Sequence, residues 1–80
     1  MMNKAEKRAI AVQVFSNAYK SVESRIESTK SYIKYDSDKI EELLNEDPEA
    51  YVDYYLEEIE RYNVEIEATE KVLEAIYKLM

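Results

Sequence analysis

The first series of mainly apolar positions advances along the chain in alternating steps of three and four residues. Its members are Val12, Phe15, Tyr19, Val22, Ile26, Thr29 and Ile33. This spacing is typical of the seam along which one helix packs against another. It predicts a helix over about residues 3–35.

A second series with the same alternation of steps fills the last third of the chain. Its members are Val52, Tyr55, Ile59, Tyr62, Ile66, Thr69, Leu73, Ile76 and Met80. The residues before it favour a helix start, because Asp47 is a good N-cap, Pro48 suits the first helical position and Glu49 suits the positive end of the helix dipole. We therefore predict a helix over about residues 48–80.

The segment between the two series also has helical features. Asp38 and Glu41 have the spacing of a capping box, and an apolar face follows over residues 40–44. Asn45 is a candidate for a left-handed cap, because the chain has no glycine to fill that role. These features predict a short middle helix over about residues 39–45.

An unbroken first helix remains the alternative to this middle helix. Ile40 and Leu43 continue the register of the first seam, and Asp36 is the only polar residue that interrupts it. On that interpretation the first helix runs to about residue 45. The break at residues 36–38 is the version we favour, while the break at Pro48 is common to both.

Two helices of similar length joined by a short connector predict an all-α antiparallel hairpin, formed by residues 1–80 as one domain. In that hairpin we expect Thr69 near Phe15, and Thr29 near Tyr54 or Tyr55. One seam leaves several apolar residues uncovered, namely Ile10, Val14, Leu56, Val64, Val72 and Leu79. We expect the middle helix or a second chain to cover them, and a homodimer forming a four-helix bundle would do so.

The composition narrows the class of protein. The 80 residues include no cysteine, which excludes disulfides and thiolate metal sites and fits a reducing cytoplasm. The chain is 46% hydrophobic, which is too apolar for a disordered protein. No apolar run approaches the roughly 18 residues of a membrane span. The net charge of −7 argues against nucleic acids and anionic membranes as direct partners.

Negative charge is concentrated in residues 36–60. This segment holds eleven acidic residues and one basic residue, Lys39, so its formal charge is −10 and the rest of the chain carries +3. Tyr51, Tyr54 and Tyr55 lie in the same segment. Tyrosine is common at binding hot spots, and carboxylates steer association with a basic surface.

We therefore predict a partner-binding surface at this end of the hairpin. Its candidate residues are Glu46, Glu49, Tyr51, Asp53, Tyr54, Glu57, Glu58 and Glu60. Acids that recur every four residues, at Glu49, Asp53 and Glu57, would form a ladder resembling a nucleic-acid backbone. The alternatives are that the acids are an ordinary solvated helix face, and that the tyrosines pack against the middle helix.

Catalytic and metal chemistry are poorly supported. The chain has no histidine or cysteine, and no glycine to shape a phosphate loop or an oxyanion turn. Residues 36–38 begin like a calcium loop, but the glycine and the last glutamate of that motif are missing. We expect no enzyme activity, no cofactor and no metal. The basic residues near the termini are too dilute for direct nucleic-acid binding.

The size and acidity of the chain resemble phage-encoded inhibitors of nucleases, including anti-CRISPR proteins. Its helix–turn–helix outline with Asp47-Pro48 resembles the small hairpin chaperones of secretion needles. Both resemblances rest on outline and composition. From the acidic segment and its tyrosines we predict a non-enzymatic acidic inhibitor or adaptor that docks on a basic, nucleic-acid-binding surface of another protein. The alternative is a bundle-forming assembly protein or hairpin chaperone that uses its apolar helix stripe.

Overall fold

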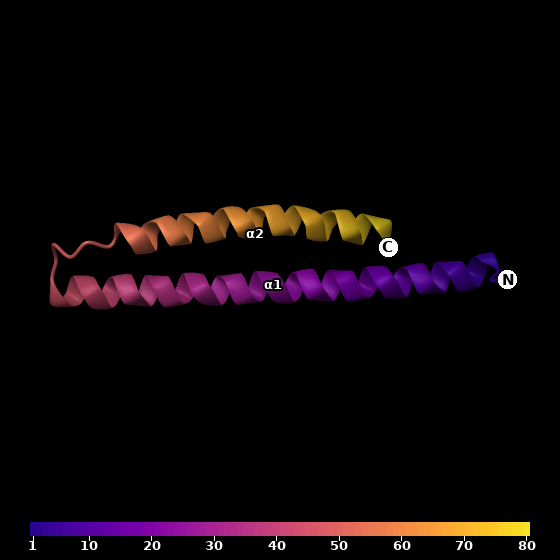
Figure 1. The fold of residues 1–80 in the computed structure, drawn as a ribbon, viewed down its shortest axis with the longest axis horizontal. Coiled ribbons are helices and arrows are strands. Elements are labelled where there is room, and N and C mark those ends of the chain that lie inside the picture. The colour runs from indigo at the N-terminus through magenta and orange to yellow at the C-terminus, as the bar shows by residue number, and fades with distance from the viewer.

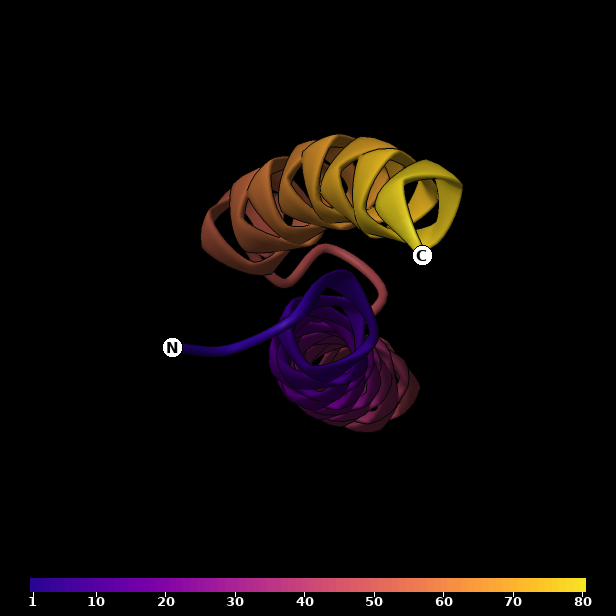
Figure 2. The ribbon, with the colours of Figure 1, turned by 90° about the vertical axis from the view of Figure 1, so that its right-hand side faces the viewer.

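The computed structural model describes all 80 residues, which form two α-helices and a short connector. Helix α1 is Lys4–Glu46 and helix α2 is Asp53–Leu79. The helices lie side by side and antiparallel in a rod of 68 × 15 × 14 Å (Figure 1). Viewed end on, α2 sweeps gradually across α1 along the rod (Figure 2). The prediction of an all-α antiparallel hairpin is therefore confirmed.

The predicted break at residues 36–38 is wrong, because α1 continues without interruption through this region. The separate helix over residues 39–45 is wrong for the same reason. Asp38 does not cap a helix start, because its carboxylate accepts a hydrogen bond from Lys34 Nζ at 3.0 Å within α1. Asn45 lies inside the helix, and no residue has a positive φ. The alternative interpretation, in which the seam continues through Ile40 and Leu43 and the first helix runs unbroken to about residue 45, agrees with the structure.

Helix α1 begins at an asparagine cap and ends at the proline. Asn3 Oδ1 accepts a hydrogen bond from the Glu6 amide at 2.8 Å, as an N-cap should. At the other end Asp47 has φ −147° and ψ 106°, the extended backbone that a following proline favours. Pro48 therefore ends α1, as the sequence predicts, but it does not begin α2.

Residues 47–50 form a turn instead of the first turn of the second helix. The Ala50 amide donates to the Asp47 carbonyl at 2.9 Å, and the Glu49 amide donates to Asp47 Oδ1 at 3.0 Å. Proline at the second position and aspartate at the first are the residues that such a turn favours. The predicted helix start at Pro48, with Asp47 as its N-cap, is therefore wrong.

Helix α2 is consequently much the shorter of the two. It has 27 residues against 43 in α1, so the expectation of similar lengths is wrong. Its N-cap is Val52, which offers no side-chain hydrogen bond, and Asp53 supplies the acid in the first turn. The N-terminal part of α1 extends past the end of α2 (Figure 1). We call residues 4–14 the α1 extension.

Three cross-helix contacts define the register. Arg25 Nη2 lies 2.8 Å from Glu65 Oε1, and ring pairs form between Tyr32 and Tyr62 and between Tyr19 and Tyr77. Thr29 and Thr69 therefore lie near this ion pair, and the expected placements beside Tyr54 or Tyr55 and beside Phe15 are wrong. The cause is the length of α1, which moves the turn of the hairpin toward the C-terminus.

The core is thin. Only Ile26, Thr29 and Asp36 are buried, three of the 80 residues, and Ile26 is the only hydrophobic one. The remaining seam residues are mostly half-buried, because one helix can cover only one side of the other. Each threonine hydroxyl donates to a carbonyl of its own helix, at 3.0 Å for Thr29 and 2.6 Å for Thr69. Neither threonine therefore bridges the helices to fix their register.

Candidate functional site

The eight predicted site residues gather around the turn of the hairpin. Glu46 is the last residue of α1, Glu49 and Tyr51 lie in the connector, and the others occupy the first two turns or so of α2. All are exposed except Glu58, which is half-buried. We call these eight residues the acidic turn: Glu46, Glu49, Tyr51, Asp53, Tyr54, Glu57, Glu58 and Glu60.

The tyrosines of the acidic turn differ in their exposure. Tyr51 is 77% exposed and Tyr54 is 61% exposed. Tyr54 is held edge-on against the half-buried Tyr55, with ring centroids 5.3 Å apart. With no middle helix present, neither Tyr51 nor Tyr54 can pack in the way that the alternative interpretation required. Two aromatic rings are thus open to solvent among carboxylates.

Basic side chains neutralise little of this surface. Lys39 lies 3.7 Å from Glu42, and Lys34 pairs with Asp38. No ion pair reaches Glu46, Glu49, Asp53, Glu57 or Glu60. The acidic turn therefore keeps its negative charge at the surface.

The acid ladder is shorter than predicted. Glu49 lies in the turn and not on α2, so a helical four-residue repeat from Glu49 does not form. Asp53 and Glu57 are one turn apart on α2, and Asp53, Glu60, Glu67 and Glu74 recur every seven residues. These residues make a line of exposed carboxylates along one side of the helix.

Asp36 is a site residue that the predicted set does not contain. Its side chain is only 3% exposed and lies in the seam opposite Glu58. As a carboxylate it would leave Oδ2 buried without a hydrogen-bond donor. Burial raises the pKa of Asp36 above its ordinary 3.8, and a hydrogen bond to Glu58 and the negative charge of Glu58 raise this pKa further. Protonated Asp36 can donate to Glu58, which satisfies the orphan oxygen.

Glu58 is held in the ionised form by its neighbours. A hydrogen bond from the Tyr54 hydroxyl is the main cause that lowers the pKa of Glu58 below 4.5, with smaller contributions from Asp36, Arg61 and Tyr62. The hydrogen bond to Glu58, followed by the negative charge of Glu58, raises the pKa of Tyr54 above 10.0. Desolvation, followed by the same charge, raises the pKa of Tyr62 above 10.0. The raised pKa of Asp36 and the lowered pKa of Glu58 therefore couple the seam to the acidic turn electrostatically.

A sequence signal for Asp36 exists. It is the only polar side chain with a charge at a seam position of α1, where an apolar residue is the rule. This signal was not used, because Asp36-Ser37-Asp38 also has the composition of a helix break and was interpreted as one. Glu58 has no comparable signal, since it is one of many glutamates on α2.

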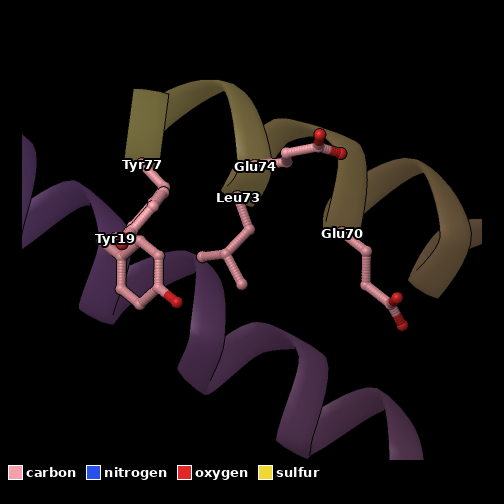
Figure 3. Close-up of a pocket in the computed structure, with 5 residues that line it drawn as sticks. All are labelled: Tyr19, Glu70, Leu73, Glu74 and Tyr77. Atoms are coloured by element: carbon pink, nitrogen blue, oxygen red, sulfur yellow. The ribbon is translucent and has the colours of Figure 1, made fainter. Parts of the chain in front are cut away.

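A shallow hollow of about 350 Å³ lies at the other end of α2 (Figure 3). It is lined by Tyr19, Glu70, Leu73, Glu74 and Tyr77. The rings of Tyr19 and Tyr77 lie 6.4 Å apart, and the two carboxylates point away from the Tyr19 ring (Figure 3). The hollow contains none of the predicted site residues, and its apolar wall suits contact with a hydrophobic side chain better than chemistry.

Two further features of the structure bear on the kinds of site it offers. The chain contains no group of three or more His, Cys, Asp or Glu side chains arranged to hold a metal ion. Neither helix has a segment that is both long and apolar enough to cross a membrane.

Comparison with protein-family models, with curated proteins and with solved structures finds no match to this chain.

Proposed function

We propose that this protein is a non-enzymatic binding module that docks its acidic turn on a basic, nucleic-acid-binding surface of another protein. It would act as an inhibitor or adaptor by occupying a surface that nucleic acid otherwise uses. The observation that carries the proposal is the exposed, unpaired set of carboxylates around Tyr51 and Tyr54. Charge of one sign increases the rate of encounter with the opposite sign, and exposed aromatic rings add affinity after contact.

The arrangement of the acids supports mimicry of a nucleic-acid strand. Asp53 and Glu57 are about 5–6 Å apart at their Cβ atoms, as all residues one helical turn apart are. Glu60 continues the same side of α2. Like charges at this spacing repel one another, and a basic cleft relieves that repulsion on binding. A helix that keeps several such pairs unpaired is therefore suited to a cationic partner.

A binding role also fits the side-chain chemistry of the chain. Tyrosine hydroxyls and carboxylates are abundant, but the chain has no histidine or cysteine to serve as base or nucleophile. We place the proposed activity in the cytoplasm, where a cysteine-free chain and a nucleic-acid-binding partner would meet.

The test is capture of partners from a lysate of the native host, with and without charge reversal. The quadruple variant Glu49→Lys, Asp53→Lys, Glu57→Lys and Glu60→Lys should lose the captured protein. The matched control reverses four exposed acids elsewhere, Glu6, Glu23, Glu27 and Glu70, and should retain it. Salt and duplex DNA should each release the partner from the native chain. Capture that is equal in both variants and insensitive to salt would refute the proposal.

A second candidate function is that of a bundle-forming assembly protein or hairpin chaperone. The observation in its favour is the thin core, since half-buried seam residues such as Ile59 and Ile66 leave apolar surface for a partner helix. Binding would then be nearly insensitive to salt. Ile59→Asn or Ile66→Asn should abolish capture while circular dichroism still reports both helices, and capture that survives either change would eliminate this candidate.

A further inference from the structure

Helix α2 carries a second apolar stripe on the side away from α1. Its members follow one another in steps of four, four, three and four residues: Val64, Ala68, Val72, Ala75 and Leu79. All five are exposed, with Val64 at 62%, Val72 at 51% and Leu79 at 65%. At 3.6 residues per turn they lie opposite Ile59, Ile66 and Leu73, the half-buried residues of the seam. We call this set the outer stripe.

The outer face of α1 has no continuous stripe of this kind. At the corresponding positions it presents Asn17, Ser21, Ser24 and Ser28, all of which are exposed. The apolar residues that precede them on this side, Ile10 and Val14, lie in the α1 extension, so the continuous apolar stripe is on α2. A helix that is apolar on two opposite sides is typically covered on both, and α1 covers only one of them.

Alternating charges border the outer stripe. Glu67, Lys71, Glu74 and Lys78 lie along one flank of it, so their signs alternate along the helix. Within the chain they form two loose pairs, Lys71 with Glu67 at 3.9 Å and Lys78 with Glu74 at 3.2 Å. Their side chains are between 66% and 76% exposed, which leaves them free to pair with a second helix.

We infer that the outer stripe is the docking surface for a second copy of this chain, with the two α2 helices antiparallel. Ala68 then faces Ala75 of the second copy, and Val64 faces Leu79 of the second copy. In an antiparallel pair, the flank that carries these charges on one helix lies beside the same flank of the other helix. Glu67 then lies near Lys78 of the other copy, and Lys71 lies near Glu74 of the other copy. The interface has twofold symmetry, the commonest arrangement of homodimers.

Small side chains at the centre favour this pairing. Ala68 and Ala75 are seven residues apart on one side of α2 and let the two helix backbones approach closely. The larger Val64 and Leu79 lie at the ends of the contact and cover it. The single chain buries only one hydrophobic residue, so a second seam gives the assembly the core that the hairpin lacks.

The charges at the ends of the rod select the antiparallel orientation. The α1 extension carries Lys4, Lys7 and Arg8, and it projects beyond the end of α2 (Figure 1). Centring the contact on the outer stripe places this basic extension level with the acidic turn of the other copy. A parallel pair would place two segments of charge −10 together at one end.

The first test is the mass of the purified full chain in solution. Sedimentation equilibrium over a wide dilution series should give twice the 9.5 kDa of one chain. Ala68→Glu buries a carboxylate in the contact and should weaken the dimer by at least about tenfold, equivalent to about 1.4 kcal/mol. Ser24→Glu, which adds the same charge to the outer face of α1, should leave the mass unchanged. A 9.5 kDa mass for the native chain at every concentration would overturn the inference.

The second test reads the orientation by cross-linking. The chain has no cysteine, so Ala68→Cys and Ala75→Cys each introduce a single thiol. An antiparallel pair places position 68 of one copy against position 75 of the other. A mixture of the two variants should therefore oxidise to a disulfide-linked dimer faster than either variant alone. Faster linkage within the Ala68→Cys variant alone would show a parallel pair and refute the proposed contact.

The outer stripe and the acidic turn have no residue in common, so different variants test the two proposals. Ala68→Glu should abolish the dimer without removing the carboxylates at the turn. The four-site reversal at the turn leaves the outer stripe intact. Loss of the dimer together with retained, salt-sensitive partner capture would leave the proposed function standing.

Discussion

Asp36 makes the protonation state of the hairpin near its turn sensitive to folding. It occupies a seam position in α1 but carries a carboxyl, and Glu58 on α2 lies opposite with Tyr54, Arg61 and Tyr62 around it. Apolar burial and a neighbouring negative charge both favour the protonated form of Asp36. The folded state therefore binds a proton at this position more tightly than the unfolded chain does.

Asp36→Asn should stabilise the hairpin at neutral pH. The amide can donate to Glu58 as the protonated acid does, but it never ionises, so no buried carboxylate oxygen is left without a donor. We expect a gain of about 1–3 kcal/mol in the free energy of unfolding, the usual cost of such a group. Urea denaturation of both proteins at neutral pH measures the gain. Asp38→Asn, at an exposed position of the same helix, is the control and should change little.

The pH dependence of stability follows from the two carboxyls together. The pKa of Asp36 is raised on folding, so its contribution is complete below its ordinary 3.8 and is lost as pH rises through the raised value. The pKa of Glu58 is lowered, so its contribution is present above 4.5 and is lost as pH falls through the lowered value. We expect the native chain to lose stability at this pair as pH rises from 3.8 through the raised pKa of Asp36. Asp36→Asn should remove that slope, and an unchanged slope would contradict the assignment.

At the scale of the elements, the seams were predictable and their ends were not. Both series of steps of three and four residues correspond to packed helix faces, because that spacing follows from helix geometry alone. The break expected at Asp38 failed because a capping box is a local preference, and the continuing seam at Ile40 and Leu43 outweighs it. Pro48 was read correctly as a break, but proline suits the second position of a turn as well as the first position of a helix.

The candidate site was also predictable only in part. The eight residues of the acidic turn lie together because the proline break locates the turn within a few residues. Asp36 was missed as a site residue because its partner, Glu58, lies 22 positions away in the chain. A pairing between helices depends on the register, and the register depends on where α1 ends. An error of one helical turn or more in that end point is enough to hide the pair.

Asp47 is the residue that should reveal the difference between a turn and a helix cap. Asp47→Ala removes the acceptor for the Glu49 amide, and we expect a loss of about 0.5–1.5 kcal/mol in the free energy of unfolding. Asp47→Asn keeps an acceptor oxygen at the same place and should retain most of the stability. Chemical denaturation compares the two variants. Equal losses would mean that the charge of Asp47 matters and the turn hydrogen bond does not.

The register can be tested at its two central contacts. Arg25 and Glu65 form an exposed ion pair, with 69% and 34% of the side chains accessible, so their coupling in a double-mutant cycle should be below about 1 kcal/mol. Ile26→Ala, one residue along, should cost about 2–4 kcal/mol because Ile26 is the only buried hydrophobic residue. A coupling that exceeded the cost of Ile26→Ala would show that the ion pair holds the helices together.

At the scale of the whole molecule, the rod has a charge gradient as well as a direction. The carboxylates of the acidic turn repel one another. The basic residues of the α1 extension lie at the far end of the 68 Å rod, so charge screening over roughly 8–10 Å in physiological salt prevents them from offsetting this repulsion. Moderate salt should therefore raise the midpoint of thermal unfolding by reducing repulsion at the turn. The four-site reversal at Glu49, Asp53, Glu57 and Glu60 should reduce that response, while the reversal at Glu6, Glu23, Glu27 and Glu70 should preserve it.

The unequal lengths of the two helices imply a gradient of local opening along α1. The α1 extension has no helix beside it, and an isolated helical segment of fewer than about 12–15 residues is marginal in water. Its amide hydrogens should exchange through fraying, long before those around Ile26 and Asp36, which exchange only when the helices separate. The helix of the α1 extension therefore forms last and is lost first. A partner that binds the α1 extension would consequently also control how much of α1 is folded.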